Sequence, residues 1–324
     1  MVLVAPHPPQ RSSAPGGAGG PGGAAGPGAA PGGAELLASL RGDASTRPRF
    51  DPGLAGGLRA WLEDAAYGVV ASRGDLAPPL SLGPRELLAA DGGAVGFGAV
   101  DGEAVGSPRE PSTGLPRPAG GPRPVGELSE EAVLGRLVHS LFRQLVAGAT
   151  LGDPWRDALD GLAADGAADH VRRCDALREP ARAALAERVA THARHIENLL
   201  PRLAPGWMPR TDDRVAIPLA GGRVVLHGTF DLLVGLPRRG DASLCALGLA
   251  TGGPWARERR SLHFLALLET LRSGTPPFRL ALLESATGRY GVEDVREDHL
   301  RALASHLSAW LASQSGPAAA SGDA

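Results

Sequence analysis

The hydrophobic pattern of this chain changes its period near residue 210, and this change limits the folds that the chain can adopt. Before it, apolar residues recur at helical spacing in residues 130–145 and 180–203. Ser129 precedes the first segment as a helix cap, and Asp153-Pro154 opens a further helical stretch between the two. The sequence therefore predicts three helices ahead of any clear strand.

After residue 210 the pattern becomes that of β-strands. Residues 214–219 and 223–234 flank the turn pair Gly221-Gly222, which predicts a β-hairpin. Residues 244–250 follow with little polarity, as is typical of a central strand that is covered on both faces.

The remaining segments complete an alternating order of strands and helices. We expect a helix at 257–272, strands at 278–284 and 290–295, and a last helix at 297–311. The order of helices, hairpin, strand, helix, two strands and helix predicts an α/β fold, an α+β sandwich with a central mixed sheet flanked by helices.

The N-terminal third has a composition unlike that of the rest. Most of the 46 Gly and 29 Pro residues lie ahead of residue 127, and residues 14–34 are almost entirely Gly, Ala and Pro, which cannot offset the cost of ordering a backbone. Within this third, apolar spacing predicts short helices at 54–65 and 84–90. The expected organisation is a disordered arm at 1–34, a small helical segment at 35–101, a Pro/Gly linker at 102–126, a folded domain at 127–313 and a disordered tail at 314–324.

The charged residues exclude several kinds of chemistry. All 33 basic residues are Arg, so this chain offers no lysine for a Schiff base, a phosphate-binding P-loop or a lysine-assisted nuclease. The net charge is -2, and residues 127–315 hold 23 Arg against 23 Asp and Glu, so no long-range positive field attracts nucleic acid.

Cysteine content and hydropathy indicate the compartment. Cys174 and Cys245 are too few for a disulfide framework or a Cys-rich metal site, which fits a reducing cytosol. No apolar stretch approaches the roughly 20 residues of a membrane span, and Met1 is not followed by a basic leader. We therefore expect a cytoplasmic protein with no membrane partner.

Two short motifs occur in a specific order and structural context. Gly135 and His139 form Gly-x-x-x-His on the first helix of the expected domain, and Gly228 and Asp231 form Gly-x-x-Asp on the second hairpin strand. Over roughly residues 80–311 the chain resembles the PD-(D/E)XK nuclease superfamily, specifically its RecB-type exonuclease branch. The resemblance implies a restriction-endonuclease-like sheet, in which His139 and Asp231 face one another across a cleft lined by the strand at Gly248.

The chain departs from this family at the catalytic residues. By alignment to Thr251-Gly252, the family's acidic residue falls on Gly248 and its lysine on Ala250. The carboxylates of active members hold Mg²⁺ or Mn²⁺ and the lysine assists the attacking water, so both kinds of assistance are lost. The family's Gln-x-x-x-Tyr motif is also altered in this chain, where Arg260 stands in place of Gln and Phe264 in place of Tyr. The resemblance thus implies a degenerate, catalytically inactive site.

Histidines offer a second way to assemble a metal site. His227 and Asp231 project from the same face of one strand, and His139 should approach that face, so these three residues could bind a transition metal. A structural role for His227, bonded to a neighbouring carbonyl, is the competing interpretation. His192 and His195 lie three residues apart on a helix, where an exposed pair is expected, because no Glu lies between them as in a zinc protease motif.

The start of the helix at 257–272 is rich in arginine. Arg257, Arg259 and Arg260 follow Gly252-Gly253-Pro254 and Trp255, so backbone amides, guanidinium groups and an aromatic face could together receive a phosphate or an unpaired base. Because Arg is electrostatically disfavoured at a helix N-terminus, the cluster is unusual, although a solvated helix start with an Arg–Glu pair is the alternative.

Three interpretations of the function follow. The first is an inactive RecB-type nuclease fold with a structural or DNA-associated role in repair or recombination, whose partners are weakly bound DNA or a DNA-repair protein. The second is a divergent, active nuclease that uses Mg²⁺ or Mn²⁺. The third is a protein-binding scaffold without a nucleic-acid role, which the neutral charge balance favours.

Overall fold

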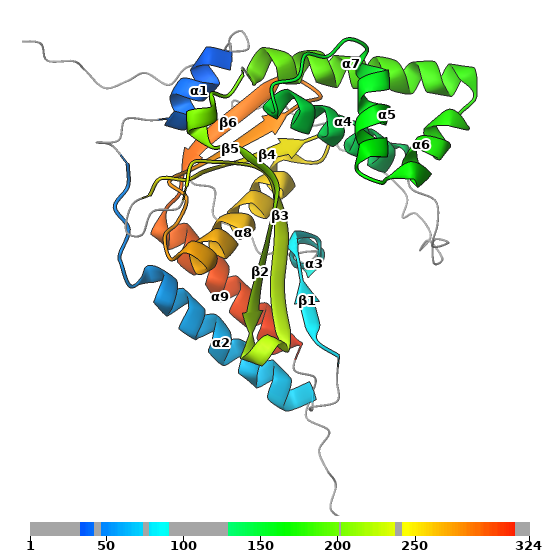
Figure 1. Cartoon of the computed structure of the whole chain (residues 1–324). Helices are drawn as coiled ribbons and strands as arrows, with labels where there is room; N and C mark the ends of the chain where they lie inside the picture. The colour runs from blue at the N-terminus through cyan, green and yellow to red at the C-terminus, as the bar shows by residue number, and fades with distance from the viewer. Residues whose placement is uncertain are drawn as a thin grey trace, which may run out of the picture. The chain divides into compact units, whose positions relative to one another are not determined.

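A mixed β-sheet of six strands is the centre of the computed structural model, which describes residues 33–41, 47–73, 78–90, 129–200, 202–236 and 242–314 (Figure 1). All of these belong to one unit, Pro31–Ala324. The strands, in chain order, are β1 (Leu80–Leu82), β2 (Arg210–Leu219), β3 (Val224–Val234), β4 (Cys245–Ala250), β5 (Arg279–Glu284) and β6 (Arg289–Asp294).

Strand β3 connects the two halves of this sheet. One of its edges pairs with β2 in an antiparallel hairpin along nearly its whole length. The other edge pairs with β1, in parallel, over residues 224–226 and with β4, antiparallel, over residues 232–234. Beyond β4, β5 runs parallel to it and β6 antiparallel to β5, which makes the sheet mixed, as the sequence predicts.

Helices cover both faces of the sheet and form two separate hydrophobic clusters with it. One face carries α2 (Leu54–Arg73), α3 (Pro84–Ala90), α8 (Trp255–Ser273) and α9 (Glu297–Ser313). The other carries α1 (Gly33–Arg41), α4 (Glu130–Val146), α5 (Pro154–Ala164), α6 (Ala168–Asp175) and α7 (Glu179–Leu199). The short 3₁₀ turns are η2 (Pro205–Trp207) and η3 (Ala220–Gly222). The predicted α/β fold with helices on both faces is therefore confirmed.

Local signals place the main helices. Ser129 Oγ accepts the backbone N–H of Ala132 at the start of α4, and Asp153 caps α5 in the same manner, as predicted. Helix α7 ends at Leu199 and does not reach residue 203, because Pro201 disfavours helical backbone in the residue before it.

Several elements differ from the sequence prediction. Helix α2 continues to Arg73 instead of ending near residue 65, since its second half is fixed mainly by the burial of the small residues Ala66 and Val69. Strand β1 and helix α6 were not expected, because three and eight residues are too short to establish a period. Consequently one strand precedes α4, and four helices, not three, occupy residues 130–199.

The N-terminal segment shares the core of the rest of the unit. Buried residues of α2, β1 and α3 belong to the same hydrophobic cluster as α8 and α9, and β1 is part of the sheet. The arm expected at 1–34 lies outside the described residues apart from Gly33 and Ala34, which begin α1. The linker at 102–126 and nearly all of the tail at 314–324 also lie outside them.

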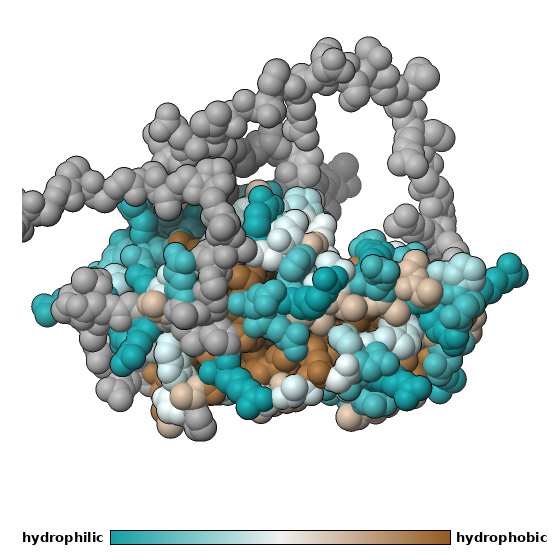
Figure 2. Space-filling view, turned by 90° about the horizontal axis from the view of Figure 1, so that it is seen from above, coloured by the Kyte–Doolittle hydropathy of each residue, from teal (hydrophilic) through white to brown (hydrophobic). Residues whose placement is uncertain are grey.

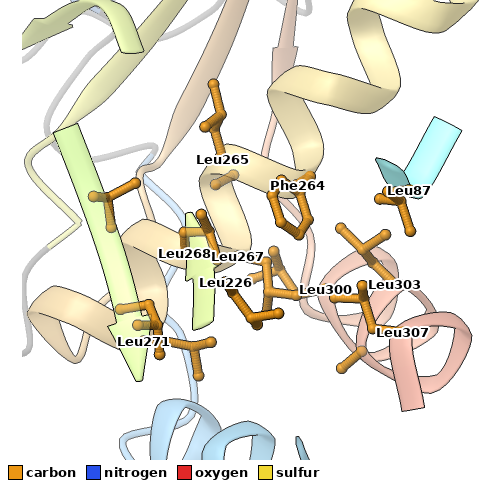
Figure 3. Close-up of a cluster of buried hydrophobic side chains, with 14 of the residues drawn as sticks. Leu87, Leu226, Phe264, Leu265, Leu267, Leu268, Leu271, Leu300, Leu303 and Leu307 are labelled. Carbon is orange, nitrogen blue, oxygen red and sulfur yellow. The ribbon is translucent and has the colours of Figure 1, made fainter. Parts of the chain in front are cut away.

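Helix α8 is the main support of the sheet on its face. Figure 3 shows its leucines and Phe264 packed among side chains of α9, α3 and β3, including Leu303 and Leu226. Phe264, at the position of the family's tyrosine, is completely buried in this cluster. It therefore has a packing role.

The surface exposes several hydrophobic residues. Seen from above, hydrophobic residues gather in the middle of the face, with polar residues around them (Figure 2). Within the described ranges, four large hydrophobic side chains are 42–59% exposed. They are Trp61 and Tyr67 on α2, and Met208 and Leu236, which follow the hydrogen-bonded residues Trp207 and Gly235 in the chain. None of the described helices is both long and apolar enough to cross a membrane.

Replacing Phe264→Ala should lower the free energy of unfolding by about 3–5 kcal/mol, because it leaves a cavity in the α8–α9 core. Urea denaturation followed by circular dichroism measures this loss. The control is Trp61→Ala, at a side chain 42% exposed, which should change stability by no more than about 0.5 kcal/mol. Equal losses in the two variants would contradict the assigned core.

Candidate functional site

Strands β1 and β4 pair with the two ends of one edge of β3, and the described strands leave the part between them without a neighbour. Strand β1 pairs with residues 224–226 and β4 with residues 232–234, so the described strands leave residues 227–231 unpaired on this edge. We call residues 227–231 the unpaired β3 edge. It includes His227 and ends with Asp231, at the point where β3 and β4 diverge.

Where β3 and β4 diverge, the side chain of Asp231 bonds β4 in place of a backbone group of β3. Its Oδ2 accepts the backbone N–H of Leu249 on β4 at 2.8 Å, beyond the end of the regular ladder. Its Oδ1 lies 3.4 Å from Nδ1 of His139 on α4. The structure thus brings together the two residues of the family motifs, in contact and not separated by a cleft.

The environment of Asp231 opposes its ionisation. The side chain is only 26% exposed, and this burial raises the pKa of the carboxyl group. His139 and the Leu249 N–H favour the carboxylate and partly offset the effect of burial. His139 itself is 37% exposed, so solvent reaches the pair from the α4 side.

The glycines of the two motifs lie where other elements approach closely. A Cβ at Gly228 would overlap the Leu265 side chain, since α8 packs directly on β3 at this position. A Cβ at Gly135 would lie 3.4 Å from Thr251 Oγ1, in the segment that follows β4. The glycine at 228 thus allows the Leu265 side chain of α8 to lie directly against β3, whereas a Cβ at 135 would meet Thr251 at an ordinary contact distance.

The positions of the family's acid and lysine lie in apolar packing. A Cβ at Gly248 would lie 3.3–3.7 Å from methyl groups of Leu282 and Leu262. Ala250 is 1% exposed and belongs to the same hydrophobic cluster. Every residue of β4 is buried, so neither position offers a polar environment.

Glu258, in the first turn of α8, is a site residue that the sequence motifs do not mark. Burial raises the pKa of its carboxyl group, the charge of Asp231 raises it further, and Arg257, His139 and Arg85 oppose the shift. Its Oε1 would be 2.5 Å from a Cβ at Gly253, so the absence of a side chain there leaves room for this carboxylate. The only sequence signal is a Glu in the first turn of a helix after a Gly-Gly pair.

His227 does not join His139 and Asp231. It lies beside Gly83, whose Cβ would be 2.9 Å from His227 Cε1, and near Glu86 at the start of α3. Four residues of strand place its Cα about 13 Å from that of Asp231. The three-residue metal site considered for these side chains is not assembled, and no group of three or more His, Cys, Asp and Glu suited to a metal ion occurs among the described residues.

The three arginines at the start of α8 have different surroundings. Arg259 forms an ion pair with Glu293 of β6, with Nε 2.9 Å and 3.0 Å from the two carboxylate oxygens. Arg260 Nε donates to the backbone oxygen of Ala256 at 3.4 Å. Arg257 is exposed and close enough to Glu258 to stabilise its carboxylate. The positive charge of the cluster is thus partly balanced by two acids.

The expectation of an exposed histidine pair on α7 is wrong for His192, which is 5% exposed. Its Nδ1 lies 2.8 Å from Ser285 Oγ, which donates to the backbone oxygen of Ala250, and His195 Nδ1 lies 2.8 Å from the backbone oxygen of Ser285. Burial lowers the pKa of His192. These bonds join α7 to the ends of β4 and β5, so both histidines have a structural role.

In sequence comparisons, no protein-family model and no curated protein matches the chain.

The Glu293 ion pair predicts a pH dependence of stability. Burial disfavours the ionised form, but hydrogen bonds from His263 and Arg259 outweigh it and lower the Glu293 pKa to about 2, against an ordinary value of 4.5. A depressed acid pKa stabilises the folded state above pH 4.5, and this contribution is lost as pH falls from 4.5 towards about 2.

We therefore expect Glu293→Gln to destabilise the protein near pH 7 and to differ less and less from the unmodified chain below pH 4.5. Urea midpoints at several pH values measure this difference. Glu187→Gln, at an exposed residue of α7, is the matched control and should show no such trend. A constant difference for Glu293→Gln at all pH values would contradict the assigned pairing.

Proposed function

We propose that this chain is a RecB-type member of the PD-(D/E)XK superfamily whose site does not cleave nucleic acid and which has a DNA-associated or structural role in repair or recombination. The observation that carries the proposal is the contact between His139 and Asp231 where β3 and β4 diverge. Two motifs that lie far apart in the sequence meet in the structure, in direct contact and not across the cleft that the resemblance implied, and this proximity supports the proposal.

The environment of β4 supports the loss of cleavage. A metal-dependent nuclease needs carboxylates for the cation and a group that assists the attacking water. Gly248 and Ala250 supply neither, and their surroundings are the leucines of α8 and β5. Arginine cannot replace the lysine as a proton acceptor, because the guanidinium group stays protonated.

The surface near the site supports weak binding of DNA. Arg257 is exposed beside Glu258, and Arg85 on α3 is close enough to influence the same carboxylate. A few guanidinium groups can contact phosphates, but the acids between them reduce the local field. Weak DNA binding, with a DNA-repair protein as the other class of partner, is consistent with this balance.

An active, divergent nuclease is the second candidate, and Glu258 is the observation that favours it. Its carboxylate interacts with both Asp231 and His139, so a modest rearrangement would give a cation two acidic ligands. In that case Mg²⁺ or Mn²⁺ would be held by Asp231 and Glu258. The cleavage assay separates the two candidates.

Purified protein should show no cleavage of single- or double-stranded DNA in Mg²⁺ or Mn²⁺ beyond that of the Asp231→Ala variant, because the second acid and the lysine are missing. Gel analysis of end-labelled DNA measures this. Cleavage that disappears in both Asp231→Ala and Glu258→Ala, but persists in Glu187→Ala, would establish the second candidate instead.

DNA binding should be weak at physiological salt and should depend on the arginines at the start of α8. Few phosphate contacts give a shallow salt dependence, with a slope of about -2 to -4 in log K against log salt. Fluorescence anisotropy of labelled DNA at several salt concentrations measures this slope, and the triple variant Arg257→Ala, Arg259→Ala, Arg260→Ala should bind more weakly.

A second triple variant is the control for the loss of charge. Arg156→Ala, Arg172→Ala and Arg182→Ala remove three exposed arginines from α5, α6 and α7, each of which also pairs with a nearby acid. Equal weakening in the two triple variants would show that net charge alone determines binding. No binding at any salt concentration would leave the scaffold interpretation.

A further inference from the structure

A pocket of about 130 Å³ lies between the first half of α8 and strands β5 and β6. Its apolar walls are Leu262 of α8 with Leu280 and Leu282 of β5, and the indole of Trp255 stands at one side. It is open to solvent on one side. The cavity that is known to hold benzene in another protein measures about 150 Å³, so this pocket is slightly smaller than one aromatic ring requires, and a flat ring can enter it only in part, by its edge, from the open side.

Trp255 is positioned by the absence of a side chain on β6. A Cβ at Gly291 would be 2.8 Å from Trp255 Cζ2, so glycine is required for the indole to lie against the strand. Trp255 is only partly buried and lines the pocket. It therefore provides an aromatic surface on which a second flat ring can stack.

The polar side of the pocket is an arginine that is held in one orientation. Glu293 accepts hydrogen bonds from Nε and Nη2 of Arg259, and its Oε1 also lies 2.9 Å from His263 Nε2. Among the described residues, no partner is found for Nη1 of Arg259. The edge formed by Nη1 and Nη2 can therefore donate two parallel hydrogen bonds to a ligand.

These features select a particular kind of ligand. It must be flat, present two adjacent acceptors on one edge, and carry no negative charge there, because Glu293 borders the same pocket. The O6 and N7 atoms of guanine form such an edge, and arginine is their most common partner. Bases that are paired in a duplex cannot enter unless they are flipped out.

We propose that this pocket binds one unpaired guanine base of a single-stranded nucleic acid, with the ring against Trp255 and O6 and N7 accepting from Arg259. The inference rests on the nucleic-acid role proposed above and adds its substrate class, single strands that contain guanine. At this size the pocket admits the O6–N7 edge of the purine, and the rest of the base, the sugar and the phosphates remain outside.

The experiment compares single strands that differ in one base. Labelled oligodeoxythymidine of about 15 nucleotides, with and without one central guanine, is titrated at low salt and followed by fluorescence anisotropy. The guanine strand should bind at least about 5-fold more tightly, since a bidentate arginine–guanine pair discriminates against another base by about 1–3 kcal/mol, whereas stacking on Trp255 is open to any base. The same guanine in a duplex should give no preference.

Variants test the two contacts separately. Trp255→Ala should remove the guanine preference, Trp255→Phe should retain part of it, and Trp61→Ala is the control for loss of a tryptophan. Arg259→Lys keeps the charge but not the paired donors, so it should lose the guanine preference, which is measured as the ratio of the two strand affinities within this variant. Thermal unfolding of each variant establishes that it is folded.

The outcomes separate this inference from the proposed function. Binding without a guanine preference would contradict guanine binding in this pocket and leave the nucleic-acid role in place. A preference that Trp255→Ala and Arg259→Lys leave unchanged would do the same. The absence of binding to every strand would overturn both.

Discussion

Strand β4 is covered on both faces, and this constraint governs the rest of the structure. Its six residues are all buried between the α8 layer and the α4 layer, so only small or apolar side chains fit. The same strand holds Gly248 and Ala250, the two positions at which the resemblance to the PD-(D/E)XK nucleases would place an acid and a lysine. The packing that stabilises the sheet therefore occupies the place of the chemistry.

The polar groups that remain have structural partners close by. Asp231 closes the end of the β3–β4 ladder. The Ser285 hydroxyl donates to the backbone oxygen of Ala250 at the end of β4, and His192 in turn bonds this hydroxyl. Buried polar groups without such partners would be costly, which explains why these side chains accompany an apolar strand. The Asp231 carboxylate thus serves as a joint between β3 and β4.

The sequence predicted the elements whose hydrophobic periodicity extends over many residues. It missed the contacts between side chains that lie far apart in the chain. Helix α4, the β2–β3 hairpin and the buried β4 are visible in spacing alone. The proximity of His139 and Asp231 was expected only from the resemblance, and across a cleft instead of in contact. Glu258 and the Arg259–Glu293 pair could not be predicted, because each depends on the side chains of other elements. The burial of His192 likewise depends on Ser285, 93 residues away.

The sheet has a mechanical weak point at the β3–β4 ladder. Only three residue pairs and the Asp231 carboxylate join the β1–β2–β3 ribbon to the β4–β5–β6 ribbon, whereas the β2–β3 hairpin has nine pairs. Helix α8 packs against both β3 and β4 on one face of the sheet and stabilises this joint. The Asp231 carboxylate therefore lengthens the shortest connection between the described strands by one hydrogen bond, and the hydrophobic clusters on both faces of the sheet hold the two ribbons together there.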